Sequence, residues 1–262
     1  MVSNYARKKV NFMSKIRVTI WNEYRHEKSE EKIAAIYPEG IHGQIAKAIG
    51  CDDFEIRTAV LDDPEHGLTD EVLDNTDVLI WWAHQAHWEG SDEIAEKVKQ
   101  KVYMGMGLIC LHSAHYSKVF QKVVGTTGNL LWGENKQEVI WNINPIHPIA
   151  QGLPSHFKLE AEEIYAEPFQ IPEPDERVFR GWFETGYVFR SGCCWRRGYG
   201  RVFYFQPGHE EFPVYYNENV IKVIKNAVYW AKPAETGYKK QWGAPCIGGE
   251  FVPDGELNGF EL

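Results

Sequence analysis

The sequence predicts an α/β fold whose sheet is mostly parallel and doubly wound, with an antiparallel extension in the C-terminal half. Through about residue 125, short apolar runs alternate with amphipathic helical segments, and the connections between them are short. This alternation is typical of parallel strands covered by helices on both faces. Beyond about residue 130, strand-like segments follow one another with little helical pattern between them. Because no linker-like stretch separates the two parts, we expect the later strands to extend the same sheet.

The strands of the first half are short apolar runs rich in β-branched residues. They are expected at residues 15–21, 54–61, 77–83 and 107–111. Between the first two strands, the segment 39–50 predicts a helix, because Ile41, Ile45 and Ile49 fall on one face and Gly50 follows as a C-terminal cap. Thr69 and Ser91 each precede a helical run, and side chains of this type cap helix N-termini.

The second half contains strand-like segments and one strong helix. The strands are expected at residues 137–145, 175–183, 186–192 and 200–208. The helix is expected over 215–231, where Val220, Ile224 and Val228 are spaced to pack on a sheet. We expect a single domain over residues 14–232.

The two ends of the chain are expected to lie outside this domain. Residues 1–13 precede the first strand and predict a disordered segment or an extension. Residues 233–262 are rich in Gly and Pro but carry Trp242, Phe251 and Phe260. We expect this tail to dock on its own subunit or on a neighbouring one, which favours a homo-oligomer.

Charge and cysteine content exclude several classes of function. The net charge is −9 and the longest basic cluster is 7–9, whereas nucleic-acid binding needs a basic patch or stripe. No apolar run approaches the roughly 20 residues that cross a bilayer. The 5 cysteines follow no repeated spacing, which is typical of a reduced, cytoplasmic protein. We interpret the adjacent Cys193 and Cys194 as buried strand residues rather than a redox or metal-binding pair.

Polar side chains, nearly all of them histidine or carboxylate, follow four of the predicted strands at their carboxyl ends. These residues are Asn22, Glu23 and His26; His84 and His87; His112 and His115; and His209, Glu210 and Glu211. In an open parallel sheet, ligands bind outside the carboxyl ends of the strands. A single histidine there would be ordinary, but convergence from several strand ends predicts a shared polar site.

The segment "ICLHSAH" is typical of a strand that turns sharply into a helix, a geometry that projects one side chain into a site. His112 occupies the projecting position. Cys110 lies inside the strand, where a buried thiol is inert. Ser113 is a weak candidate nucleophile because nothing places it at the tip of the turn.

Several segments taken together resemble the ThuA-like (trehalose utilisation) family, within the class I glutamine amidotransferase-like fold. The matching segments span residues 16–231 and are "WNEYRHE", "IYPEGIH", "LIWWAHQAHWE", "GLICLHSAH", "HPIAQGLPSHFKLEAEEIY" and "GHEEFPVYYNENVIKVIKNAVYWA". Amidotransferases of this fold carry a cysteine at the strand–helix turn, paired with a histidine after a late strand. Here His112 replaces that cysteine and His209 keeps the histidine, so glutamine hydrolysis through a thioester is not expected.

The resemblance implies a carbohydrate ligand, trehalose-related or an oxidised disaccharide. The abundance of Trp and Tyr points weakly in the same direction, because such rings form the walls of sugar sites. The resemblance also selects Glu163 and Tyr165 as residues that face the ligand. The residues expected to bind substrate are Tyr37, Trp82, His87, His115 and Glu211.

Three mechanisms remain open from the sequence. In the first, His84, His112 and His209 bind a divalent metal, zinc being the best match for imidazole ligands, with His87, His115 and Glu211 orienting them or replacing one of them. In the second, Glu23, Glu163, Tyr165 and His209 catalyse proton transfer without a metal. In the third, the protein is a sugar-binding or regulatory module that carries out no chemistry.

Overall fold

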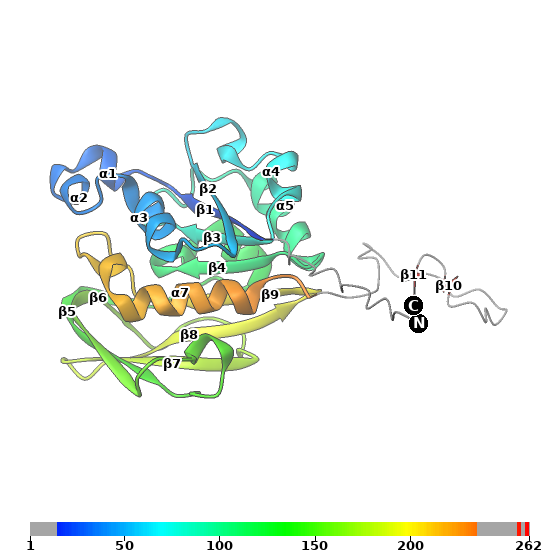
Figure 1. Cartoon of the computed structure of the whole chain (residues 1–262). Coiled ribbons are helices and arrows are strands. Elements are labelled where there is room, and N and C mark those ends of the chain that lie inside the picture. Colours follow the sequence, from blue (N-terminus) through cyan, green and yellow to red (C-terminus); the bar gives the residue numbers. More distant parts are fainter. Residues whose placement is uncertain (1–14, 235–255, 258–259, 262) are drawn as a thin grey trace, which may run out of the picture.

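The structure is a computed structural model that describes residues 15–234, 256–257 and 260–261. Nine strands form one sheet in the order β2-β1-β3-β4-β9-β8-β7-β5-β6 (Figure 1). Their bounds are β1 Ile16–Asn22, β2 Phe54–Val60, β3 Val78–Trp82, β4 Gly107–Leu111, β5 Leu131–Asn142, β6 His156–Ala166, β7 Glu176–Phe183, β8 Val188–Arg197 and β9 Gly200–Phe205. The first five strands in this order pair in parallel, and the pairs from β9 to β6 are antiparallel. The predicted fold class is confirmed.

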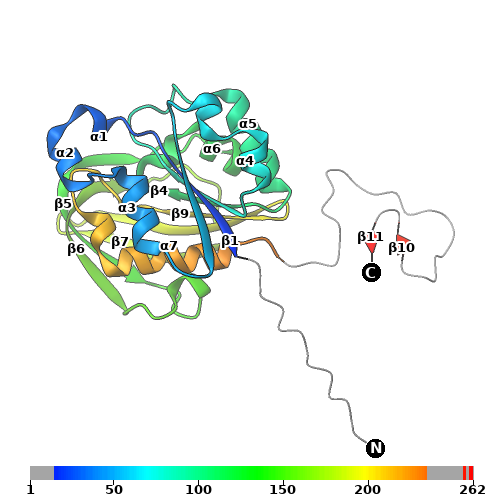
Figure 2. The same cartoon turned by 45° about the horizontal axis from the view of Figure 1, so that its top comes forward.

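Helices cover both faces of the parallel strands (Figures 1 and 2). Their bounds are α1 His26–Ser29, α2 Glu31–Ile36, α3 Gly40–Ile49, α4 Asp70–Asp74, α5 Asp92–Tyr103, α6 Lys118–Phe120 and α7 Glu218–Ala231. Alternate residues of each strand enter opposite cores, as the two-residue period of a strand requires. Ile80 and Ile109 pack with α3 and α7, whereas Leu79 and Leu108 pack with α5 and α6.

The helix starts and faces predicted for the first half are present. The Thr69 hydroxyl accepts a hydrogen bond from the Val72 N–H, and the Ser91 hydroxyl accepts from the Ile94 N–H. Ile41 is fully buried, as are the two other isoleucines on the same face of α3. These local signals therefore fix where the connections leave the sheet, and with them the rim that the strand ends share.

The antiparallel extension differs from the prediction mainly in its two outermost strands. The sequence predicted no strand over 156–166, yet β6 forms the edge of the sheet there, and β5 begins at Leu131, ahead of its predicted start at Gln137. The pairing of these two strands shifts register on both sides of Lys136. Such irregularities break the alternation of apolar and polar residues that identifies a strand in sequence. Cys193 and Cys194 are buried within β8, as predicted.

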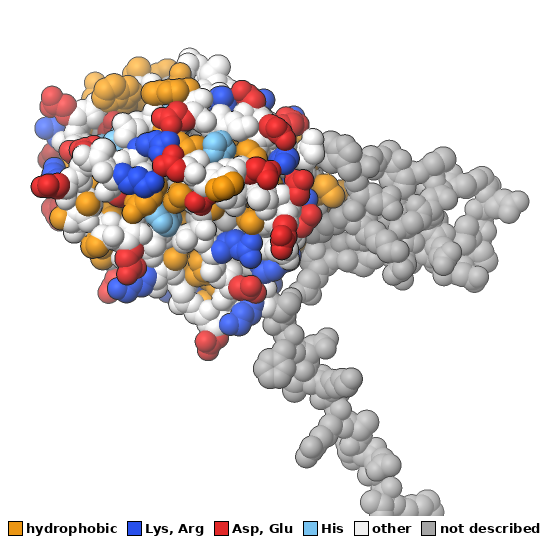
Figure 3. Space-filling model, turned by 90° about the horizontal axis from the view of Figure 1, so that it is seen from above, with side chains coloured by type: hydrophobic (Ala, Val, Ile, Leu, Met, Phe, Trp, Pro, Cys, Tyr) orange, Lys and Arg blue, Asp and Glu red, His pale blue; other side chains and the backbone are white. Residues whose placement is uncertain are grey.

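The two ends of the chain lie largely outside the described residues. The predicted extension at 1–13 lies outside the described residues, as does most of the predicted docking tail at 233–262; within that tail, β10 Glu256–Leu257 pairs with β11 Phe260–Glu261. In the described part of the chain, no helix combines the length and apolar character needed to cross a membrane. On the face that Figure 3 shows, acidic and basic side chains are interspersed.

Candidate active site

The turn after β4 holds His112 in a strained backbone conformation. His112 has φ +51°, in the left-handed region that residues other than glycine seldom adopt, and it begins a 3-10 turn over His112–Tyr116. Its side chain is fully buried. Its Nδ1 lies 3.2 Å from the Gln206 carbonyl oxygen, to which it donates. Because Nδ1 carries that proton, Nε2 is the nitrogen left to act in the site.

Four side chains from four different elements meet next to this turn. They are His84 after β3, His112 after β4, Glu163 on β6 and His209 after β9. One ligand atom from each lies within 4.8 Å of the others. The ring centroids of His84, His112 and His209 are 5.4 Å apart in every pair. The structure thus brings together the three histidines that the strand-end rule selected, and it adds a carboxylate to them.

The centre of this cluster contains two buried polar atoms that have no hydrogen-bond partner. These are His112 Nε2 and Glu163 Oε2, which lie 3.4 Å apart and form an ion pair when His112 is protonated. Glu163 Oε2 is also 3.9 Å from His84 Nε2. Buried polar atoms are almost always paired, since an unpaired one costs about 1–3 kcal/mol. The arrangement is therefore suited to a cation that all of these atoms could contact.

The charges in the cluster favour a bound cation. Burial lowers the pKa of His112, but the carboxylates of Glu163, Glu162 and Glu210 outweigh burial and raise it to about 8. Burial raises the pKa of Glu163, but the interactions with His112, His209 and His84 lower it by more. The net shift of the pKa is therefore downward. Without a metal, a proton on His112 balances the carboxylate. A divalent cation at the same place would displace that proton.

The donor set fits a zinc-like metal. Three imidazoles and one carboxylate are ligand types that Zn²⁺ takes, and because zinc sites can expand to five ligands, water or substrate would bind as a fifth ligand beside these four. At His209, the Glu211 N–H lies 3.2 Å from Nδ1 and donates to it. Burial lowers the pKa of His209 to about 4, so the ring is neutral. Because its Nδ1 accepts a hydrogen bond, the ring proton is on Nε2, and a metal bound there would displace it.

Buried carboxylates fix the loops that carry the histidines. Glu23 accepts hydrogen bonds from the N–H groups of Gln85 and Ala86 at 2.9 and 3.0 Å, so it holds the loop that bears His84. The sequence selected Glu23 as an acid or base, and the structure places both of its carboxylate oxygens on backbone groups.

Glu162 holds the opposite side of the cluster. Its carboxylate accepts from the N–H groups of Gly208, His209 and Glu163 at 2.8, 3.0 and 3.1 Å. Burial raises the pKa of Glu162 to about 7. A side chain at position 208 would collide with Tyr215, and Gly208 has φ +147°, so only glycine suits this loop. Glu162 was assigned no role from the sequence, because it stands in a run of carboxylates, "EAEE", whose spacing does not tell a buried glutamate from a solvated one.

A cleft of about 540 Å³ opens beside the cluster. Its lining residues are His84, Gln85, His87, Trp88, Ser113, His115, Tyr116, Asn129, Leu130, Trp132, Glu163 and Tyr165. Because His84 and Glu163 belong both to the cleft and to the cluster, a ligand in the cleft reaches the cluster directly. Trp88 and Trp132 are 72% and 74% exposed and form aromatic walls. Tyr165 stacks on His112 with ring centroids 5.2 Å apart.

The residues expected to bind substrate divide into two groups. His87 and His115 line the cleft; His87 Nε2 is 3.4 Å from the Ser113 hydroxyl, and His115 Nδ1 donates to the Gly128 carbonyl at 2.7 Å. Burial lowers the pKa of His87 to about 4 and that of His115 to about 3, so both stay neutral.

The other three residues of that prediction do not line the cleft. Trp82 is fully buried beneath the histidines and donates to the Gly208 carbonyl. Tyr37 is buried in the core and donates to the Phe212 carbonyl at 2.5 Å. Glu211 accepts from Asn135. Their place in the sequence beside strand ends gave no indication of which way the side chains point.

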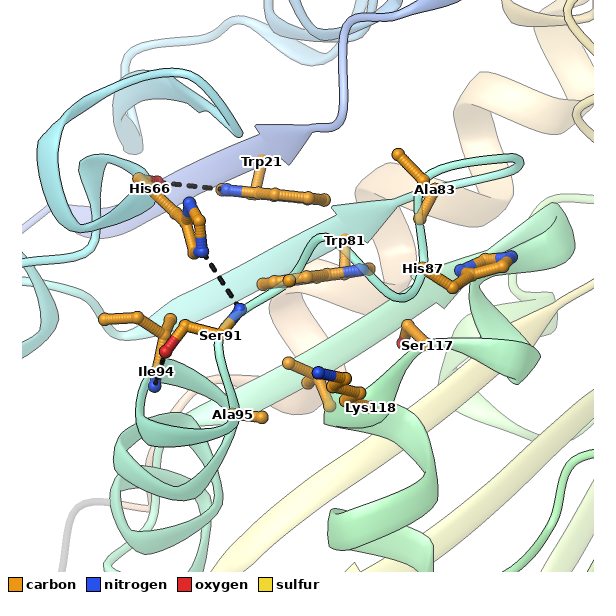
Figure 4. A pocket seen from close by; sticks show the side chains of 13 residues that line it. Trp21, His66, Trp81, Ala83, His87, Ser91, Ile94, Ala95, Ser117 and Lys118 are labelled. Atoms are coloured by element: carbon orange, nitrogen blue, oxygen red, sulfur yellow. Dashed lines mark hydrogen bonds between the residues drawn. The ribbon is translucent and has the colours of Figure 1, made fainter.

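A small cavity of about 10 Å³ lies between α5 and the loop that follows β3 (Figure 4). Trp21 and Trp81 stack there, with ring centroids 3.8 Å apart. His66 links three segments, because its carbonyl accepts from Trp21 Nε1 and its Nε2 accepts from the Ser91 N–H. His87 borders both this cavity and the cleft. The packing of this region supports the loop that carries His84 and His87.

Comparisons with known proteins agree with this architecture. Among models of protein families, the one described as "ThuA: Trehalose utilisation" matches residues 17–231. None of the curated proteins compared with the chain matches it. A ThuA-like protein of Parabacteroides merdae is similar in structure, with a TM-score of 0.60, 14% identity, and coverage of 86% of this chain and 94% of that one. A ThuA-like protein of Bacteroides uniformis gives 0.58 and 18%, with 87% and 94% covered. A glutamine amidotransferase of Thermotoga maritima gives 0.51 and 10%, with 83% and 98% covered.

Proposed function

This chain belongs to the ThuA (trehalose utilisation) family, and we propose that it is a metal-dependent enzyme acting on a carbohydrate related to trehalose. The observation that carries the proposal is the convergence of three imidazoles on Glu163, with two buried atoms among them, His112 Nε2 and Glu163 Oε2, that make no hydrogen bond. In this proposal His84, His112, Glu163 and His209 hold the metal. When bound, the metal would polarise a carbonyl or hydroxyl oxygen or activate water.

The cleft supports a carbohydrate as the ligand. Polar groups of His87, Ser113 and Tyr165 line it, and Trp88 and Trp132 form exposed walls. Sugars present hydroxyl groups at their edges and C–H groups on their faces. Hydrogen-bonding groups and flat indole rings complement these two surfaces. Burial raises the pKa of Tyr165 well above its usual value, so its phenol stays protonated and donates to the ligand.

Amidotransferases of this fold carry a cysteine at the strand–helix turn, and the resemblance places His112 at that position. We therefore propose no glutaminase activity. The nearest candidate thiol along the chain, Cys110, is fully buried in β4, and burial raises its pKa. A thiol in that state is a poor nucleophile. We also propose a cytoplasmic location, with the support that the described cysteines Cys51, Cys110, Cys193 and Cys194 are all free.

A metal-free enzyme is the second candidate, because His112 and Glu163 lie 3.4 Å apart with a raised and a lowered pKa respectively. Two such groups can exchange a proton with a substrate. One of them would act as acid while the other acts as base.

Elemental analysis of untreated protein, followed by assays before and after chelation, separates these candidates. We expect a first-row divalent metal in the untreated protein, and conversion of trehalose or an oxidised disaccharide that stops on chelation and returns on reloading with Zn²⁺. Full turnover by the stripped protein would instead establish the metal-free enzyme. Sugar binding without turnover in either form would make the protein a binding module.

A further inference from the structure

We propose that the chain holds a second divalent-cation site, formed by His26, His84 and Glu210, which shares the His84 ring with the first cluster. This inference rests on the proposed function only in that His84 is common to both sites. His26 opens α1, His84 follows β3 and Glu210 follows β9. Among the described residues, these three form one of two groups of His, Cys, Asp or Glu side chains whose ligand atoms converge closely enough to hold a metal.

The spacing of the three ligand atoms matches that of a small coordinated cation. His26 Nε2 is 2.9 Å from His84 Nδ1 and 3.5 Å from Glu210 Oε1, and the latter two atoms are 3.2 Å apart. With bonds of the length that Zn²⁺ makes to nitrogen and oxygen, neighbouring ligands of a tetrahedron lie about 3.4 Å apart. Two imidazoles and a carboxylate are ligands of the same kind as those in the first cluster.

Counting the protons shows why hydrogen bonds alone do not satisfy this group when its rings are neutral. His26 Nδ1 lies 2.9 Å from Glu30 Oε1, so the ring proton of His26 is directed to Glu30. His26 Nε2 and Glu210 Oε1 are then both acceptors, and both face His84 Nδ1, which can carry at most one proton. One proton cannot make two good hydrogen bonds here. A cation among the three atoms would satisfy all of them at once.

The second oxygen of Glu210 lies on the side of the first cluster, not of the second site. Glu210 is buried, and its Oε2 has no hydrogen-bond partner. Its neighbour on that side is His209 Nδ1, at 3.7 Å. The Glu210 Oε1 atom, which faces His26 and His84, is the oxygen available to the second site. Glu210 therefore has an oxygen for the second site and faces a ligand of the first.

The shared ring joins the two sites. His84 Nδ1 faces His26 and Glu210, whereas His84 Nε2 is the nitrogen nearer to Glu163. The two nitrogens of an imidazole point in different directions, and each can bind a cation once the ring has lost its proton. The His84 ring would then bridge the two cations, one at each nitrogen. The second cation would fix the orientation of this ring and add positive charge beside the first site.

The test is the number of metal ions that the full chain binds. Protein stripped with a chelator is reloaded with Zn²⁺, and bound zinc per chain is measured by mass spectrometry after removal of excess metal. We expect two ions in the unchanged protein, one in His26→Ala, one in His112→Ala, and neither held tightly in His84→Ala. The matched control is His156→Ala, which removes an exposed histidine on β6 and should still bind two.

The outcomes separate this inference from the proposed function. One ion in the unchanged protein, kept by His26→Ala and lost by His112→Ala, would overturn the second site and leave the first intact. Two ions that persist in His26→Ala would also overturn it, because the second ion would then lie elsewhere. No bound metal at all would overturn both proposals. If circular dichroism shows that His26→Ala does not fold, His26→Gln and Glu210→Gln carry the same test.

Discussion

In the parallel half of the sheet the site residues are histidines in the loops that follow strands, whereas in the antiparallel extension they lie within a strand. His84, His112 and His209 come from the first group, and Glu163 and Tyr165 of β6 from the second. The parallel half supplies imidazole nitrogens at a shared rim. The extension supplies negative charge and part of the cleft. The site is complete only where the two halves meet.

The two halves of the sheet therefore contribute differently to the site. Loops at the ends of parallel strands converge because the strands run the same way, so the topology by itself gathers the imidazoles. The edge strand β6 reaches the same place because β5, β7 and β8 extend the sheet around the site. Substitutions in the parallel half should therefore affect metal binding first, and those in the extension should affect geometry and substrate.

The largest effect is expected from removing a ligand of the parallel half. We expect His112→Ala to lose at least about 100-fold in Zn²⁺ affinity at the first site, because outer partners of metal ligands already cost 10–100-fold, and to lose activity. Isothermal titration measures the affinity. His156→Ala should change neither quantity. Unaltered zinc affinity in a folded His112→Ala protein would show that the histidines of the parallel half do not bind the metal.

The next effect tests the supporting role of the extension. Glu162→Gln leaves a single acceptor oxygen for three backbone N–H groups. We expect unfolding free energy to fall by about 1–3 kcal/mol, and zinc affinity to fall about 10–100-fold as the loop of His209 loosens. Glu160→Gln is the matched control, since it changes an exposed residue of the same strand. If the two variants had the same unfolding free energy and the same zinc affinity, Glu162 of β6 would not support the site.

A third prediction concerns pH and the second histidine of the turn after β4. Burial lowers the pKa of His115 from 6.5 to about 3, so protonation favours the unfolded chain. Its contribution to stability is full above pH 6.5 and is lost as pH falls toward 3, by about 1.4 kcal/mol per pH unit. Chemical denaturation across this range should show a shallower acid slope for His115→Gln than for the unchanged protein. Parallel slopes would contradict the buried, neutral state of His115.

The smallest effect is expected at the walls of the cleft. Trp132→Ala on β5 and Trp88→Ala in the loop after β3 should each weaken sugar binding by about 0.5–1.5 kcal/mol, the usual value of an aromatic contact. This corresponds to roughly 2- to 13-fold in KM, with kcat little changed. Trp182→Ala on β7 removes an exposed indole that does not line the cleft and serves as the control. A loss confined to Trp88→Ala would assign substrate binding to the parallel half alone.

The parallel half could be predicted from sequence because its signals are local. Apolar runs, the caps at Thr69 and Ser91, and the turn at His112 identified the strand ends, and the strand-end rule then selected His84, His112 and His209. What the sequence did not predict is the direction in which some of these side chains point. Trp82 was expected to contact substrate, but it lies beneath the histidines, since alternation along β3 decides which core it enters.

The extension was harder to predict because its signals are not local. Glu162 lies within a run of carboxylates that reads as solvated, and its burial depends on backbone groups of the loop after β9, far along the chain. His26 and Glu210 were recognised as strand-end residues but were given no role. Their convergence on His84 depends on three loops at once, which no single segment of the sequence encodes.

The most direct test of the metal site is a crystal of the Zn²⁺-loaded chain measured on both sides of the zinc absorption edge. We predict an anomalous difference peak bonded to the side chains of His84, His112, Glu163 and His209, at the distances zinc makes to nitrogen and oxygen. A crystal of fully loaded protein with no peak among these four side chains would contradict the account.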